Sequence, residues 1–144
     1  MSNHSLVRIL LVDDFALWRR FVIAKLRQNH NMRIVGVASD GLAAVLKAEE
    51  LHPDVILLDV GLPKITGIEA ARRIRKVAPK SKILFLTQEL DVDVARVALS
   101  DGQGYVVKSD ADKELITAVE AVLQGKKFVS LQLSRQAFAD HVDS

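Results

Sequence analysis

Five short runs rich in Val, Ile and Leu recur along the chain, each separated from the next by a longer and more polar segment. The runs do not alternate strictly between apolar and polar residues, which is typical of strands covered on both faces of a sheet. The expected strands are Val7–Val12, Arg33–Ala38, Val55–Asp59, Ile83–Thr87 and Gly104–Val107.

The segments between these strands carry apolar residues at helical spacing. In the first segment Trp18, Phe21, Val22 and Leu26 share a helical pattern, and we interpret Trp18 as helix packing rather than as a platform for a ligand. The other expected helices are Leu42–Glu50, Ile68–Val77, Val92–Leu99 and Leu115–Leu123. Because strand and helix take turns along the chain, the sequence predicts an α/β fold, a doubly wound parallel sheet with helices on both faces.

Composition narrows the class of protein. At 144 residues, of which 49% are hydrophobic, the chain is long enough for one domain with its own core. It has no cysteine, which excludes disulfides, thiolate nucleophiles and cysteine-based zinc sites. It has no apolar stretch of about 20 residues and no basic segment leading into a hydrophobic one at its start, so we expect a cytoplasmic protein without membrane contact.

The charge pattern does not favour nucleic acid as a partner. The net charge is +2, and the densest basic stretch, Arg72 to Lys76, falls late in an expected helix, where cations complement the helix dipole. No aromatic residue is interleaved among these charges. We therefore expect no direct nucleic-acid binding by this chain.

Acidic residues follow two of the expected strands. Asp13 and Asp14 come directly after the first strand, and Asp59 ends the third. Ligands of doubly wound sheets bind outside the carboxyl ends of the strands, so we expect these side chains to lie close together. Crowded carboxylates repel one another and favour a divalent cation. We expect Mg²⁺, held by carboxylates of this group and by a backbone carbonyl near Gly61.

Two more polar residues follow neighbouring strands, Thr87 after the fourth and Lys108 after the fifth. A carboxylate can attack phosphorus to form an aspartyl phosphate. The transferring group carries negative charge on its equatorial oxygens, which an ammonium and a hydroxyl group can stabilise. The strand ends therefore predict a phosphoryl-transfer site in which Asp59 is both acceptor and metal ligand, and Lys108 and Thr87 contact the phosphoryl group.

These motifs resemble the receiver domain of two-component response regulators over about Leu6 to Lys127. The residues that carry the resemblance are Leu11–Asp14, Leu58–Pro63, Thr66–Gly67, Leu86–Thr87 and Gly104–Lys108. Within that family the chain is most similar to the NarL/FixJ type, judging by Gly61–Pro63, by Gly104–Tyr105 leading to Lys108–Ser109, and by Gly125–Ser130.

The resemblance implies a flavodoxin-like (CheY-like) fold, a five-stranded parallel sheet of strand order 2-1-3-4-5. Residues 1–127 would form the receiver domain, and residues 128–144 a C-terminal tail or the start of a linker. A sensor histidine kinase or a phosphotransfer protein would phosphorylate Asp59, while Asp13 and Asp14 organise the magnesium.

The resemblance also implies a switch. Thr87 would move toward the phosphate and Tyr105 would turn inward, reshaping the surface of helix four, strand five and helix five. We expect a homodimer or another partner to bind that surface. Such a protein is not a metabolic enzyme but a phosphoacceptor that catalyses its own phosphorylation and dephosphorylation.

Other functions fit less well. An FMN-binding protein would need a phosphate-binding loop where Asp13–Phe15 stands. A haloacid-dehalogenase-like phosphatase would need a second acid at Gly61. A docking module that works without phosphorylation stays open, because Gln88 follows Thr87 where the family usually has a small residue.

The C-terminal tail leaves the output open. About fourteen residues follow Ser130, too few for a helix-turn-helix domain. The chain is therefore either a single-domain regulator or the receiver of a longer transcription factor, which would reach DNA only through an output domain.

Overall fold

One parallel sheet forms the centre of the computed structural model, which describes residues 6–136. Its strand order is β2-β1-β3-β4-β5-β6, and each neighbouring pair is parallel. The strands are β1 (Val7–Val12), β2 (Met32–Ala38), β3 (Val55–Leu58), β4 (Lys82–Thr87), β5 (Gly104–Val107) and β6 (Phe128–Val129).

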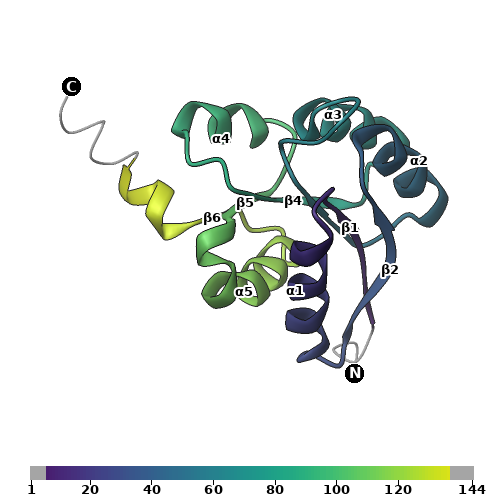
Figure 1. The fold of residues 1–144 in the computed structure, drawn as a ribbon, viewed down its shortest axis with the longest axis horizontal. Coiled ribbons are helices and arrows are strands. Elements are labelled where there is room, and N and C mark those ends of the chain that lie inside the picture. Colours follow the sequence, from purple (N-terminus) through teal and green to yellow (C-terminus); the bar gives the residue numbers. More distant parts are fainter. Residues whose placement is uncertain (1–5, 137–144) are drawn as a thin grey trace.

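Helices cover both faces of this sheet (Figure 1). On one face lie α1 (Ala16–Arg27) and α5 (Ala111–Leu123), and on the other α2 (Gly41–Leu51), α3 (Gly67–Val77) and α4 (Val92–Ala98). Within β1, Leu10 and Val12 face the second group while Ile9 and Leu11 face the first. Strands apolar on both sides therefore produce two hydrophobic cores, which confirms the predicted α/β fold.

Short polar side chains fix where the helices on the second face begin. Asp40 accepts a hydrogen bond from the Ala43 amide at the start of α2, and Thr66 accepts one from the Glu69 amide at the start of α3. Such caps pair amides that have no partner within the helix. None of the helices in residues 6–136 is long and apolar enough to cross a membrane.

The last helix begins earlier than its apolar spacing indicated. A 3-10 turn, Lys108–Asp110, leads directly into α5, whose first residue is Ala111 rather than Leu115. The acidic residues Asp112 and Glu114 lie in its first turn, where they complement the positive end of the helix dipole. Polar residues begin this helix, so hydrophobic periodicity alone did not detect its start.

The sheet has a sixth strand that the sequence analysis did not predict. After α5 the chain turns at Gly125, whose φ of 81° suits a residue without a side chain. It then runs beside β5, where the Phe128 amide donates to the Gln103 carbonyl and the Ser130 amide donates to the Tyr105 carbonyl. A strand of two residues carries too little periodicity to be recognised, and the order of the first five strands is as predicted.

Ser130 joins this strand to the rest of the domain. Its hydroxyl accepts a hydrogen bond from the Val107 amide (2.8 Å) and donates one to Glu114 Oε1 (2.6 Å). Residues 131–136 form a helical turn, in which the Leu131 amide donates to Glu114 Oε2 and Leu133 is buried. The predicted tail therefore packs on the core through Leu133, and its residues 137–144 lie outside the described part of the chain.

We predict that Ser130→Ala lowers the free energy of unfolding by about 1–3 kcal/mol, because it leaves a buried amide unpaired. Urea denaturation followed by circular dichroism measures the change. Ser134→Ala, at an exposed position in the same helical turn, is the matched control. Equal stability of the two variants would contradict the role assigned to Ser130.

Candidate functional site

Three carboxylates meet at the carboxyl ends of β1 and β3. One oxygen from each of Asp13, Asp14 and Asp59 lies within 4.8 Å of the others. Strand pairing fixes this arrangement, because the Asp13 amide donates to the Ala38 carbonyl and the Asp59 amide donates to the Val12 carbonyl. Asp13 and Asp59 are buried, whereas Asp14 is exposed. The structure thus brings together the three acids that the sequence placed at this edge.

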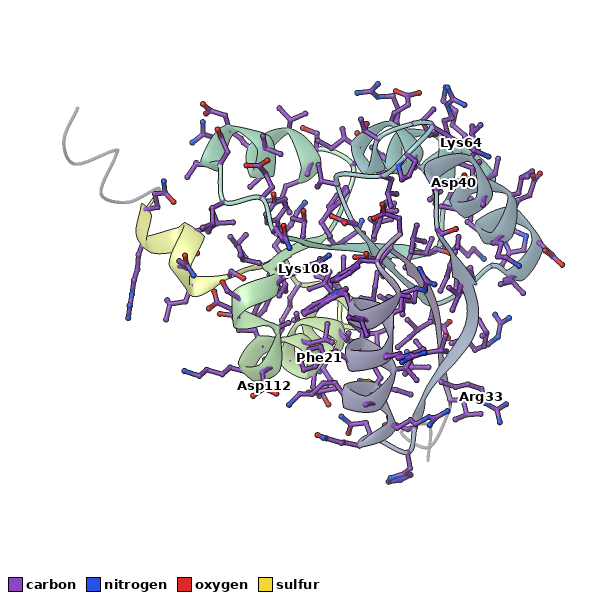
Figure 2. The ribbon with its side chains drawn as sticks, in the orientation of Figure 1. Phe21, Arg33, Asp40, Lys64, Lys108 and Asp112 are labelled. Carbon is purple, nitrogen blue, oxygen red and sulfur yellow. The ribbon has the colours of Figure 1, made fainter. Side chains whose placement is uncertain are left out.

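Lys108 brings a positive charge to the acids from the end of β5 (Figure 2). Its Nζ lies 2.7 Å from Asp13 Oδ2 and 3.5 Å from Asp59 Oδ2. Only 9% of its side chain is exposed, so solvent weakens these ion pairs less than it would at the surface. One ammonium does not balance three carboxylates, and the remaining negative charge favours a divalent cation.

Burial dominates the electrostatics of Asp13. It raises the pKa of this carboxyl above its ordinary value, and the neighbouring charge of Asp59 adds to the rise. The Lys108 ammonium and the Phe15 amide act in the opposite direction without reversing it. In the absence of a cation, the ionised form of Asp13 is therefore less favourable in the folded protein than in the unfolded chain.

The loop after Asp59 is shaped by a glycine. A Cβ atom on Gly67 would collide with the carbonyl group of Asp59, so only glycine lets α3 begin this close to the acid. The Gly67 amide donates to the Val60 carbonyl, and the Gly61 amide donates to Asp59 Oδ1 at 3.3 Å. Glycine at position 67 thus allows the chain to return directly beside the carboxylate.

The acids and Lys108 line one open cavity of about 460 Å³. Carboxylate oxygens are the donors that Mg²⁺ prefers, so the residues present fit this ion. Gln88 also lines the cavity, as expected for a residue that follows Thr87. The full lining is Asp13, Asp14, Phe15, Asp59, Val60, Gly61, Thr87, Gln88, Glu89 and Lys108.

The backbone of Glu89 links Thr87 to Tyr105. The Thr87 hydroxyl accepts a hydrogen bond from the Glu89 amide at 3.3 Å, and the Tyr105 hydroxyl donates to the Glu89 carbonyl at 3.0 Å. Tyr105 is fully buried, and burial followed by the negative charges of Glu89 and Asp59 raises the pKa of its phenol. The ring thus already faces inward, and one peptide segment joins it to the cavity.

Trp18 lies closer to the site than the sequence analysis recognised. As expected, it packs on the core and against Phe21, with 4.9 Å between the ring centroids. Its ring also lies 5.0 Å from Lys108 Nζ. The sequence held one signal for this proximity, because Trp18 follows Asp14 by four residues. It therefore lies in the first turn of α1, the helix that begins beside the cavity.

Comparison with known sequences gives a consistent result. The family profile of the response regulator receiver domain matches residues 9–120. The response regulator GacA of Pseudomonas viridiflava is 33% identical over 132 residues, which cover 91% of this chain and 62% of GacA. The oxygen regulatory protein NreC of Staphylococcus epidermidis is 33% identical over 139 residues, covering 95% and 64%. The chain thus spans less than two thirds of the length of these relatives.

Solved structures similar to this chain are also response regulators. A two-component response regulator of the LuxR family from Aurantimonas sp. SI85-9A1 superposes with a TM-score of 0.91 at 32% identity, covering 96% of this chain and 99% of that one. The isolated REC domain of RcsB from Salmonella enterica serovar Typhimurium, solved with the phosphomimetic BeF3-, gives 0.84 at 25% identity, covering 91% and 98%. RcsB dimers bound to DNA give 0.83 at 25% identity, covering 91% and 67%.

We predict that Asp13→Asn raises the thermal unfolding temperature at pH 7 without divalent cations. The raised pKa means that the folded state binds a proton more readily than the unfolded chain, so ionised Asp13 opposes folding above that pKa. The advantage of the variant should be complete above the raised pKa and should shrink as the pH falls through that pKa toward the ordinary value of the carboxyl. Calorimetry in chelator between pH 4 and 7 measures both effects.

Asp14→Asn is the control for this prediction, because its exposed carboxylate pays little desolvation cost. We expect a smaller change in the unfolding temperature for this variant. If Asp13→Asn is instead less stable than the wild type at pH 7, the ion pair with Lys108 outweighs the cost of burial and the argument is wrong.

Proposed function

The chain belongs to the receiver domain family of two-component response regulators, and we propose that it accepts a phosphoryl group on Asp59 from a sensor histidine kinase or a phosphotransfer protein. The observation that carries this proposal is the joint contact of Lys108 with Asp13 and Asp59 inside one cavity. The expected acceptor Asp59, the acids Asp13 and Asp14, and the Lys108 ammonium therefore lie close together without a phosphoryl donor.

In the proposed reaction a carboxylate oxygen of Asp59 attacks the phosphorus atom of the donor phosphohistidine. The new O–P bond forms as the P–N bond breaks, and the leaving imidazole takes up a proton. Lys108 stabilises the charge on the phosphoryl oxygens, and the Thr87 hydroxyl donates a hydrogen bond to one of them. Asp13 orients Lys108 through its ion pair.

The same residues would hold the cofactor that we propose, Mg²⁺. Asp13, Asp14 and Asp59 offer carboxylate oxygens, and the backbone carbonyl of Gly61 is the further ligand. When bound, the ion neutralises charge on the phosphoryl oxygens. Crowding of the acids around a single ammonium supports this assignment.

Phosphorylation of this kind is a signal rather than metabolic catalysis. We propose that the domain also promotes hydrolysis of its own aspartyl phosphate, by water entering the same cavity. Gln88 is exposed at the cavity wall, where its side chain can hinder that water. The lifetime of the phosphorylated form then depends on Gln88 as well as on Lys108.

We predict that acetyl phosphate with Mg²⁺ adds one phosphoryl group to the wild type and none to Asp59→Asn. Intact-mass spectrometry measures the addition directly. A chelator should prevent it, because the ion would no longer offset the repulsion among the carboxylates. Equal labelling of Asp59→Asn would show that another residue is the acceptor.

A second candidate function is a docking module that acts without phosphorylation. The inward ring of Tyr105 favours it, because the switch residue already has the orientation that phosphorylation is expected to produce. A wild type that stays unlabelled by acetyl phosphate and by a phosphorylated partner would support this alternative.

We propose that partners bind the surface of α4, β5 and α5. Ala95 and Ala98 of α4 are buried, whereas Val97 is 52% exposed, so the helix keeps an apolar residue on its outer side. β6 pairs with the outer edge of β5, whose residues are all buried, so β6 and residues 131–136 take the place of β5 at this surface, with Leu131 54% exposed. The relative RcsB forms dimers on DNA, and we propose a homodimer here, with DNA contacted only by an output domain of a longer protein.

We predict that a beryllofluoride mimic of phosphorylation promotes dimerisation and that Val97→Asp weakens the dimer by roughly tenfold, because a charge replaces an apolar contact. Sedimentation equilibrium measures the dissociation constants. Leu46→Asp, at a more exposed position on α2, is the matched control. Identical sedimentation with and without the mimic would exclude dimerisation as the response.

A further inference from the structure

Among the described residues, the ammonium of Lys108 pairs with two acids and also lies over one aromatic ring. Besides Asp13 and Asp59, its Nζ faces the ring of Trp18 at 5.0 Å from the centroid. An ammonium at this distance from an indole ring is attracted by the negative face of the aromatic system. The ring lies on α1, and it joins that helix directly to the residue that would bind the phosphoryl group.

Packing alone does not explain why this position holds tryptophan. The Trp18 Nε1 atom is buried, and no described residue accepts a hydrogen bond from it. A buried donor without a partner destabilises the folded state, a cost that phenylalanine or leucine would avoid. The Trp18 ring contacts the Phe21 ring and the Lys108 ammonium, and only the contact with Lys108 draws on the negative charge of the aromatic face.

A second cavity lies beside Lys108, and the Trp18 ring forms part of its wall. It has a volume of about 430 Å³ and shares Phe15, Gln88 and Lys108 with the acidic cavity. Its other lining residues are Trp18, Leu90, Val107 and Ser109. A flexible lysine beside such a space has room to turn away from the acids. The attraction of Trp18 limits this freedom.

We propose that Trp18 is a positioning residue for Lys108 in phosphoryl transfer, an inference that rests on the proposed function. Both acids that contact Lys108 have other roles in the proposed reaction, since Asp59 becomes an aspartyl phosphate and Asp13 is an expected metal ligand. The indole ring takes part in neither event. It holds the ammonium toward the place where the phosphoryl oxygens arrive.

The test compares Trp18→Phe and Trp18→Leu with the wild type, using acetyl phosphate at saturating Mg²⁺. We expect the rate of phosphorylation to fall roughly 3- to 10-fold in Trp18→Leu and less in Trp18→Phe, which keeps a weaker aromatic face. Trp18→Phe should unfold at the same or a higher temperature than the wild type, because the unpaired donor is gone. Slower transfer without lost stability is a result that a merely structural role does not produce.

Ile23→Ala provides the matched control, because Ile23 packs on the same core from the same helix without lining either cavity. It should lower stability and leave the phosphorylation rate unchanged. Wild-type rates in both Trp18 variants, or a rate loss in Ile23→Ala as large as that in Trp18→Leu, would overturn the proposal.

A second readout does not depend on phosphorylation. Trp18 is the single tryptophan of the chain, so its fluorescence reports the contact directly. We expect Lys108→Met to shift the emission, because it removes the charge over the ring. Unchanged emission would overturn the inference even if the wild type is phosphorylated. If the wild type is not phosphorylated but Lys108→Met still shifts the emission, the proposed function is wrong while the contact between Trp18 and Lys108 is supported.

Discussion

Repulsion among three carboxylates, offset by a single ammonium, is the constraint on which the site depends. Asp13 and Asp59 are buried side by side because β1 and β3 pair in register, with Val12 opposite Leu58. Lys108 reaches them because β5 ends at the same edge of the sheet. The single ammonium offsets only part of the negative charge of the three carboxylates, and the charge that remains favours a divalent cation.

The fold connects this cluster to a surface through short contacts. The Glu89 backbone joins Thr87 at the cavity to Tyr105 in the core, and Tyr105 shares its hydrophobic core with Ala95 and Leu133. Ser130 ties β5 to α5 and to the C-terminal helical turn. One peptide segment at Glu89 therefore contacts both Thr87 at the cavity and the buried ring of Tyr105.

Most of the strands and the acidic residues of the site could be predicted from the sequence, because each is marked by a short run of neighbouring residues. Apolar runs ending at Asp13 and Asp59 indicate buried strands and a shared edge, and the order of the first five strands follows from the resemblance. β6 was missed because its two residues pair only after Gly125 reverses the chain. The contact of Trp18 with Lys108 was also missed, because it joins residues far apart in sequence whose separation no periodicity reports.

The most direct test of the central claim is to locate the modified residue. Wild-type protein treated with acetyl phosphate and Mg²⁺ can be reduced with borohydride, which converts an aspartyl phosphate to homoserine, and then sequenced by tandem mass spectrometry. We expect homoserine at position 59, and none at positions 13 or 14. Homoserine at either of those positions, or at no position, would contradict the assignment of Asp59 as the acceptor.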